Sequence, residues 1–260
     1  MQWTDEGLVL GTRPHGESSV VLEVLTRDHG RHLGLVRGGR SRRMQPILQI
    51  GNSVQLNWRA RLDEHLGMFS VEPLRMRAAA LMESALAVHG VQLFAALVRL
   101  LPERDPHQRF FIAGEVILQS FADPALCGEL MVRLELETLN DLGFGLDLTR
   151  CAATGGTADL VYVSPKSGRA VSEIAGRPYH GKLLALPAFL AERVRAGGPN
   201  PEALRLAYDL TGFFLLKNVY EPRGIKMPDV RAGFLLALRR CLEEKRATDQ
   251  ADPSADSAIE

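Results

Sequence analysis

Residues 26–49 form a short basic stretch, TRDHGRHLGLVRGGRSRRMQPILQ, whose side chains are the best suited in the chain to binding chemistry. It contains six arginines against one acid, Asp28, and four of the arginines surround the pair Gly38-Gly39. Guanidinium groups are planar and permanently charged, which suits them to phosphate, and glycines let a backbone approach a ligand closely. The stretch therefore predicts a surface that binds a polyanion.

The alternative is an ordinary solvated loop, which is the commoner meaning of a charge run. Against it, residues 1–80 contain no lysine, whereas a surface that needs only solubility usually mixes both cations with acids. Arginine is also the residue that binds phosphate through two parallel hydrogen bonds. We therefore predict phosphate contacts from the arginines on and beside this loop: Arg37, Arg40, Arg42, Arg43, Arg59 and Arg61.

The composition predicts a globular protein that acts through local charge. The chain has 260 residues, 46% of them hydrophobic, and its 31 basic and 31 acidic side chains cancel. Affinity for nucleic acid must then come from charge gathered on one surface. Because neither a signal peptide nor a run of roughly twenty apolar residues is seen, we expect a cytoplasmic protein with no membrane association.

The first part of the chain has the pattern of a small β-barrel. Five short β-rich runs separated by turn residues fit between residue 6 and about residue 71, and a basic connection between the third and fourth is compatible with an OB-fold. In SVQLNWRAR, alternation places Val54, Leu56 and Trp58 on one face, with Arg59 and Arg61 beside them. Trp58 is interpreted mainly as a core residue, with base stacking as the alternative.

Beyond residue 77 the apolar residues recur at helical spacing. We therefore expect an α+β protein with an N-terminal OB-fold barrel and a mainly α-helical C-terminal domain. A small β-hairpin is expected as an insertion in the second domain. The expected boundaries are 1–77 for the barrel, 78–246 for the helical domain, 150–178 for the hairpin module and 247–260 for a disordered acidic tail. Helices are expected at 79–101, 107–122, from Pro124, and at 180–196, 201–219 and 228–246.

Signatures of common enzymes are not found in the sequence. It has no Walker A, G-x-S-x-G, H-E-x-x-H or G-x-G-x-x-G sequence, so we expect neither catalysis nor a cofactor. The three cysteines, Cys127, Cys151 and Cys241, lie too far apart for a disulfide framework or a zinc knuckle. His29 and His32 have a spacing that metals sometimes use, but few ligands lie near them, so no metal site is predicted.

Several strings resemble those of one bacterial family when taken in order. Those in the first domain are W-x-D-E-G-L-V-L from Trp3, R-P-H-G-E-S-S from Arg13, L-T-R-D-H-G-R from Leu25 and L-V-R-G-G-R-S-R-R from Leu35. Those in the second are R-L-E-L-E-T-L-N-D-L-G-F-G-L-D-L-T-R-C-A from Arg133 and N-V-Y-E-P-R-G-I-K-M-P-D-V-R from Asn218. Their order and spacing resemble the RecO family of recombination mediators over nearly the whole chain.

This resemblance implies a DNA repair protein that binds single-stranded and double-stranded DNA and anneals complementary strands. It implies partnership with RecR and with the single-stranded DNA-binding protein SSB in loading RecA, and association with the nucleoid. It also implies that Arg133 helps bind the acidic, apolar C-terminal tail of SSB, near Phe110 and Phe111 of the preceding helix. An intrahelical pair between Arg133 and Glu137 is the alternative.

One departure from the family concerns zinc. Many members carry two C-x-x-C pairs in the inserted module, whereas this chain keeps only Cys151, has Thr154 where the pair-mate would lie, and has RAVSEIA in place of the later pair. The resemblance therefore implies a degenerate, zinc-free module held by packing. An RNA-binding protein, an enzyme or a small-ligand-binding OB-fold protein remain the alternative functions.

Overall fold

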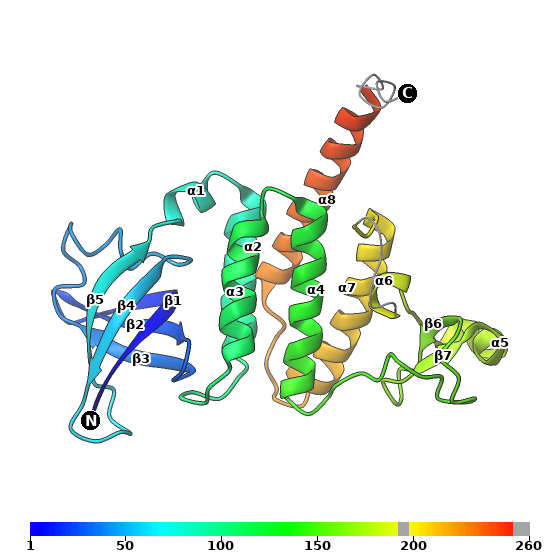
Figure 1. Cartoon of the computed structure of the whole chain (residues 1–260), viewed down its shortest axis with the longest axis horizontal. Helices are drawn as coiled ribbons and strands as arrows, with labels where there is room; N and C mark the ends of the chain where they lie inside the picture. Colours follow the sequence, from blue (N-terminus) through cyan, green and yellow to red (C-terminus); the bar gives the residue numbers. More distant parts are fainter. Residues whose placement is uncertain (192–197, 252–260) are drawn as a thin grey trace, which may run out of the picture. The chain divides into compact units, whose positions relative to one another are not determined.

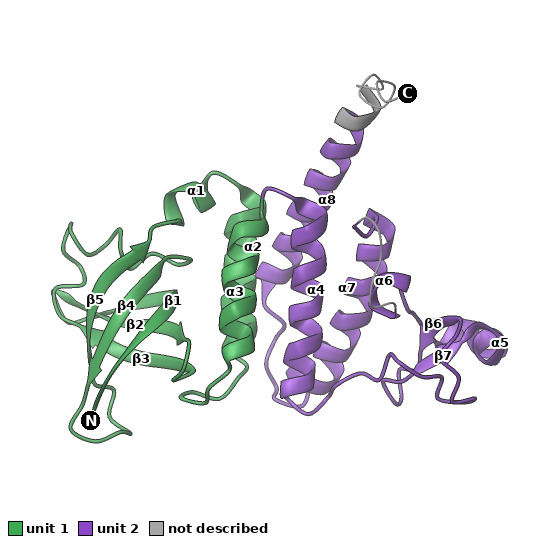
Figure 2. Ribbon diagram, viewed as in Figure 1, with its two compact units in different colours: residues 1–121 green, residues 122–260 purple. Residues whose placement is uncertain are grey.

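The computed structural model describes residues 1–191 and 198–251, and the chain divides into two compact units, Met1–Phe121 and Ala122–Glu260 (Figure 2). The tail expected at 252–260 and the last part of the helix expected at 180–196 lie outside the described residues. Within the described part, no helix is long and apolar enough to cross a membrane.

Unit 1 begins with a closed five-stranded barrel, in which hydrogen-bonded neighbours follow the order β1-β2-β3-β5-β4 (Figure 1). The strands are β1 (Gln2–His15), β2 (Ser19–Thr26), β3 (Arg31–Val36), β4 (Ser53–Arg59) and β5 (Met68–Arg75). Neighbours pair antiparallel except β3 and β5, which meet in parallel at Leu35 and Met68. The expected α+β class, with a small barrel first, is confirmed.

Trp58 is a core residue of this barrel. Its side chain is 0% exposed and its indole N–H donates to the Leu66 carbonyl at 3.1 Å. Gly67 has φ +65°, and a Cβ at that position would lie only 2.3 Å from Nε1 of Trp58, so the turn over the indole requires glycine. The alternative in which Trp58 stacks on nucleic-acid bases is wrong, because a fully buried ring offers no face to a ligand.

His32 lies in the same aromatic cluster, with ring centroids 5.0 Å from Trp58 and 5.2 Å from Trp3. Burial is the main cause that lowers the pKa of His32 to about 4. One nitrogen of the neutral ring, Nδ1, forms a 2.9 Å hydrogen bond with the Leu33 carbonyl oxygen. His29, the other member of the pair with metal-like spacing, contacts Asp5 at 2.8 Å.

This pKa makes the barrel sensitive to acid. A histidine in the unfolded chain titrates near 6.5, so the contribution of neutral His32 is complete above pH 6.5 and is lost as the pH falls toward 4. The loss over that window amounts to roughly 3 kcal/mol. We expect denaturant unfolding to show a shallower dependence on pH between 6.5 and 4 in His32→Gln than in the wild type. The exposed His15→Gln serves as the control, and identical pH dependences in wild type and His32→Gln would contradict the assignment.

Three helices complete unit 1: α1 (Ala78–Met82), α2 (Ala85–Val98) and α3 (Gln108–Ser120). The single helix expected at 79–101 is divided, because the Ser84 hydroxyl accepts a hydrogen bond from the Ala87 amide and so starts α2 as a new helix. Glu115 of α3 joins the helices to the barrel through Ser53, Arg75 and Arg77. These contacts explain why the compact unit extends past the expected boundary at residue 77.

The described residues of unit 2 form three long helices and a small sheet. The helices are α4 (Pro124–Asp141), α7 (Pro201–Leu215) and α8 (Asp229–Ala251), with the π-helical turn η2 (Leu216–Tyr220) after α7. The inserted module contains β6 (Leu160–Val163), β7 (Ala170–Ser172), α5 (Glu173–Gly176), η1 (Arg177–Lys182), β8 (Leu184–Ala185) and α6 (Ala188–Ala191). Its three strands pair in the order β7-β6-β8.

Two expectations for unit 2 are corrected by these elements. A continuous helix at 180–196 is wrong, because Leu184 and Ala185 pair with β6 as a third strand. Disorder from residue 247 is also wrong for residues 247–251, which continue α8. The residues before this point are rich in Glu, Lys, Arg and Ala, which are good helix formers, so the helix continues past the expected end.

A buried ion pair joins the three long helices. Glu135 of α4 is 0% exposed and accepts from Arg231 of α8 at 2.7 and 3.0 Å. The Thr211 hydroxyl of α7 donates to the same carboxylate, and Arg231 also donates to the Tyr208 carbonyl at 2.8 Å. Both charges are thus paired and hydrogen-bonded, which is the condition for tolerating them in a core.

Candidate nucleic-acid interface

The basic loop spans residues 37–52 between β3 and β4, and its arginines are exposed. Gly38 has φ +66° and forms the turn out of β3. Gly39 has a different role, because a Cβ there would lie 2.5 Å from a Val20 methyl group. This glycine allows the loop to pack onto β2, and the expectation that it approaches a ligand is corrected.

Arg40 is partly committed to structure. Its guanidinium donates to the carbonyls of Gly16 and Glu17 at 3.3 and 3.0 Å, and its backbone amide donates to the Ser18 carbonyl at 3.0 Å. The residue therefore ties the basic loop to the turn between β1 and β2. Its cation stays exposed.

Apart from Arg40, the arginines of the barrel fall into two groups. The first group forms ion pairs with acids: Arg27 with Glu6, Arg31 with Glu23, and both Arg75 and Arg77 with Glu115. A second group has side chains with no hydrogen bond or ion pair to any residue that the structure describes: Arg13, Arg37, Arg42, Arg43, Arg59 and Arg61. Five of the six predicted phosphate-binding arginines thus have guanidinium groups left available to a ligand.

Strand register places two of these arginines on one row across the outer face of the barrel. Directly paired residues are Arg13 with Val21, Val21 with Leu35, Leu35 with Met68, and Met68 with Arg59. Paired residues project to the same side of a sheet, so two arginines bracket a strip of three apolar side chains. Four strand spacings make this row roughly 19 Å long. We call it the outer row.

The remaining free arginines lie close in sequence to residues of the outer row. Arg37 comes two residues after Leu35 at the end of β3, and Arg61 comes two residues after Arg59 at the start of the β4–β5 loop. Arg42 and Arg43 follow in the basic loop. Exposed acids, including Asp63 and Glu64, lie in the β4–β5 loop, so the surface is basic without being uniformly so.

Within residues 1–77, all of which the structure describes, no tryptophan, tyrosine or phenylalanine ring is fully exposed. Trp58 and Phe69 are buried, and the half-buried Trp3 stacks on His29 at 4.1 Å. Base stacking on aromatic rings is the usual source of salt-independent affinity for single strands. A ligand on this surface would be held chiefly by charge.

Arg133 lies on α4 and is about half exposed. Its Nε and Nη2 donate to Glu129 Oε1 at 2.9 and 2.7 Å, and Nη2 also donates to the Phe189 carbonyl at 3.2 Å. Glu129, one turn before Arg133, is thus a partner that the sequence interpretation did not name. Phe110 and Phe111 are 0 and 2% exposed in the core of unit 1, so neither ring offers a surface on which a peptide tail could lie.

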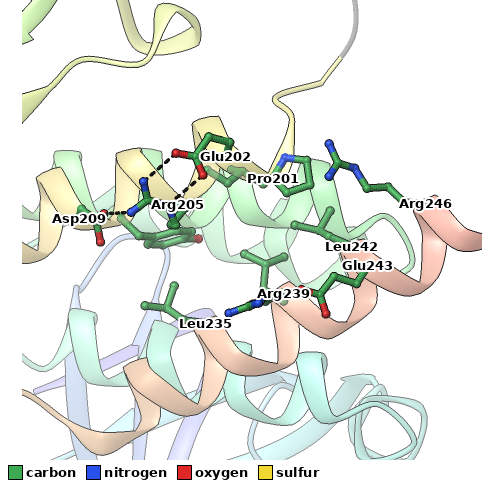
Figure 3. Close-up of a pocket in the computed structure, with 12 residues that line it drawn as sticks. Pro201, Glu202, Arg205, Asp209, Leu235, Arg239, Leu242, Glu243 and Arg246 are labelled. Carbon is green, nitrogen blue, oxygen red and sulfur yellow. Dashed lines mark hydrogen bonds and ion pairs between the residues drawn. The ribbon is translucent and has the colours of Figure 1, made fainter.

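Unit 2 does contain an apolar cleft, between α7 and α8, of about 430 Å³ (Figure 3). Its floor includes the buried side chains of Leu204, Tyr208 and Leu238. Three arginines lie at its edge, and two are paired: Arg205 with Glu202 and Asp209, and Arg239 with Glu243. The cleft edge is therefore close to neutral.

Cys151 marks the place where the family pattern would put zinc. Its Sγ accepts from the Ser172 amide at 3.3 Å and lies 3.4 Å from the Ser172 hydroxyl. Burial raises the pKa of this thiol, but hydrogen bonds with Ser172 and Thr154 outweigh it and lower the pKa to about 6. Among the described residues, no group of three or more His, Cys, Asp or Glu side chains could hold a metal ion.

Comparison with known proteins gives a consistent result over both units. The family model "Recombination protein O N terminal" matches residues 1–77, and "Recombination protein O C terminal" matches residues 83–225. The chain is 60% identical over 242 residues to DNA repair protein RecO of Rhizobium johnstonii, covering 93% of this chain and 94% of that protein. It is 55% identical over 259 residues to DNA repair protein RecO of Agrobacterium fabrum, covering 100% of both.

Proposed function

The chain belongs to the RecO family of DNA repair proteins, and from that premise we propose that it is a non-enzymatic mediator that binds DNA through its phosphates. It takes up single-stranded and double-stranded DNA, anneals complementary strands, and acts with RecR and SSB in loading RecA. The observation that supports this most directly is the grouping of unpaired arginines on the basic loop and the outer row. Its place of action is the cytoplasm, at the nucleoid.

Binding by phosphates suits a protein that anneals strands. Arginines hold the sugar-phosphate backbone without reading sequence, and no exposed aromatic ring on the barrel sequesters the bases. The apolar side chains of Val21, Leu35 and Met68 offer a shallow strip against which sugars can lie. A strand held in this way keeps its Watson–Crick edges free to pair with a second strand. The test is the dependence of single-strand affinity on salt, because each phosphate contact releases counterions.

Partner binding is proposed at Arg133, where the guanidinium would receive the terminal carboxylate or neighbouring acids of the SSB tail. Titration of a peptide of this tail should show binding to Arg133→Ala weakened by about tenfold, the range expected for losing one charged hydrogen bond. Binding of naked single strands should not change.

The α7–α8 cleft provides the control for that prediction. Arg239 lies on the cleft edge and, like Arg133, is an exposed arginine paired with a glutamate four residues away. The peptide should bind Arg239→Ala as tightly as the wild type. A loss in Arg239→Ala with none in Arg133→Ala would move the docking site to the cleft.

The inserted module is proposed to fold without zinc. Cys151 is held by hydrogen bonds to Ser172, so packing and these bonds replace what a metal would fix. Elemental analysis of purified protein should find no stoichiometric zinc, and a chelator should leave the melting temperature unchanged. One zinc per chain, or melting on chelation, would contradict this, because structural zinc sites contribute directly to folding.

A further inference from the structure

A polar cleft of about 440 Å³ lies on the outer face of strands β1, β2 and β3, beside the outer row. Its cationic lining consists of Arg13 from β1, Arg31 from β3 and Arg99, the residue that follows α2. Two acids also line the cleft, Glu23 of β2 and Glu103, which pairs with Arg104. Arg13 and Val21 line the cleft and also belong to the outer row, so the two surfaces are continuous.

Glu23 bridges two of these arginines. Its Oε1 accepts from Arg31 Nη1 at 3.1 Å, and its Oε2 accepts from Arg99 Nε at 2.8 Å. The Glu23 and Arg31 side chains are each 16% exposed, so this half of the bridge is largely removed from water, whereas the Arg99 side chain is 44% exposed. One carboxylate between two guanidinium groups reproduces the contacts that a phosphate would make.

Two of the three cations of the cleft, Arg31 and Arg99, are also held by contacts that do not involve Glu23. Arg99 Nη2 donates to the Leu10 carbonyl at 3.0 Å, and a Cβ at Gly11 would lie 3.1 Å from the same nitrogen, so glycine lets Arg99 lie across β1. Arg31 Nη2 reaches the Leu101 carbonyl at 3.5 Å. These contacts would keep both guanidinium groups in position if another anion took the place of the carboxylate.

Two donors in the cleft are left over by the Glu23 bridge. The Arg31 Nε is buried and has no hydrogen-bond partner among the described residues, and the exposed Arg13 side chain makes no hydrogen bond or ion pair there. A buried donor without an acceptor is uncommon in folded proteins. A phosphate group, which has more acceptor oxygens than a carboxylate, matches this set of donors better than Glu23 does.

We propose that this cleft is a second phosphate site, in which a backbone phosphate of single-stranded DNA binds Arg13, Arg31 and Arg99 by displacing the Glu23 carboxylate. This inference rests on the proposed DNA binding. It adds that the Glu23 carboxylate competes with the DNA phosphate for the arginines of the cleft. Glu23 pairs with Arg31 and Arg99 when no strand is present, and its charge opposes the incoming phosphate. The competition keeps single-strand affinity below what the arginines alone would give, which favours release of the strand after pairing.

The test is fluorescence anisotropy of labelled oligothymidylate with four full-length proteins: wild type, Glu23→Gln, Arg13→Ala and Glu6→Gln. Glutamine keeps acceptor and shape at position 23 but removes the charge, so Glu23→Gln should bind at least about threefold more tightly. Arg13→Ala should bind more weakly, with a slope of log affinity against log salt smaller by about 0.7. Glu6→Gln removes one acid that pairs with Arg27 outside the cleft, and it should match the wild type apart from the small effect of net charge.

The outcomes separate this inference from the function on which it rests. If the wild type binds with a strong salt dependence that the basic loop controls, but Glu23→Gln and Arg13→Ala both behave like wild type, the cleft is no phosphate site and DNA binding stands. If the wild type does not bind the oligonucleotide, both are overturned. Arg13 makes no contact that the fold needs, so Arg13→Ala remains informative if Glu23→Gln lowers the melting temperature.

Discussion

Replacing Glu135 with alanine should lower the free energy of unfolding by about 3–5 kcal/mol, the range found when one partner of a buried ion pair is removed. Glu135 is 0% exposed, and its carboxylate is the anion for Arg231, which is only 9% exposed. Without it, the guanidinium stays buried in the core of unit 2 with the Tyr208 carbonyl and the Thr211 hydroxyl as its remaining partners. Denaturant unfolding followed by circular dichroism measures the effect.

Two controls separate the buried charge from the loss of a side chain. Arg239→Ala breaks an exposed pair with Glu243 and should leave the free energy of unfolding nearly unchanged, because solvent screens such pairs. The double change Glu135→Leu/Arg231→Met removes both charges and should recover most of the stability lost in Glu135→Ala, since well-packed apolar residues often replace a buried pair at little cost. A loss below about 1 kcal/mol in Glu135→Ala would show that the pair does not hold the helices together.

Reversing two charges in the basic loop should nearly abolish binding of single strands. In Arg42→Glu/Arg43→Glu, two exposed guanidinium groups without partners among the described residues become carboxylates facing the DNA backbone. We expect affinity for oligothymidylate at low salt to fall on the order of 100-fold, from the lost phosphate contacts and the new repulsion. The melting temperature should stay close to that of wild type, because neither side chain supports the fold.

A matched charge reversal in unit 2 provides the control. Arg150→Glu/Lys166→Glu changes the net charge of the chain by the same amount, at two exposed positions without partners among the described residues. Affinity should fall only by the small amount that net charge explains. Equal losses in the two double variants would show that the protein binds through its overall charge and not through the basic loop.

The fold class was predictable because the periodicity of the apolar residues indicates which segments form strands and which form helices. Alternation in β4 placed Trp58 inside the barrel, and the change to helical spacing after residue 77 marked the end of the strands. The extent of unit 1 was not predictable, because it depends on Glu115 meeting Ser53, Arg75 and Arg77 across long stretches of chain. Local patterns do not encode such contacts.

The candidate site, like the fold, was only partly predictable from the sequence. The basic loop was visible in the sequence because its arginines are neighbours. Arg13 was missed as a candidate, because only strand register places it on one row with Arg59. The commitment of Arg40 to the β1–β2 turn was likewise invisible, since its acceptors lie more than twenty residues earlier.

The strings that resemble the RecO family in the second domain have a structural explanation. Glu135 belongs to the string that begins at Arg133, and Arg231 ends the string that begins at Asn218. The two residues meet in the buried ion pair of unit 2. Part of the resemblance therefore lies in the core of this chain's helical domain, and a matched residue in these strings need not contact DNA or a partner.

If arginines of the basic loop hold single strands by their phosphates, these contacts should set how strongly binding depends on salt. The measurement compares wild type with Arg37→Ala/Arg42→Ala/Arg43→Ala over a range of salt concentrations, leaving Arg40 in place because it anchors the loop. Three lost phosphate contacts should reduce the slope of log affinity against log salt by about 2. A triple variant with the slope and affinity of wild type would contradict the claim and remove the loop from the interface.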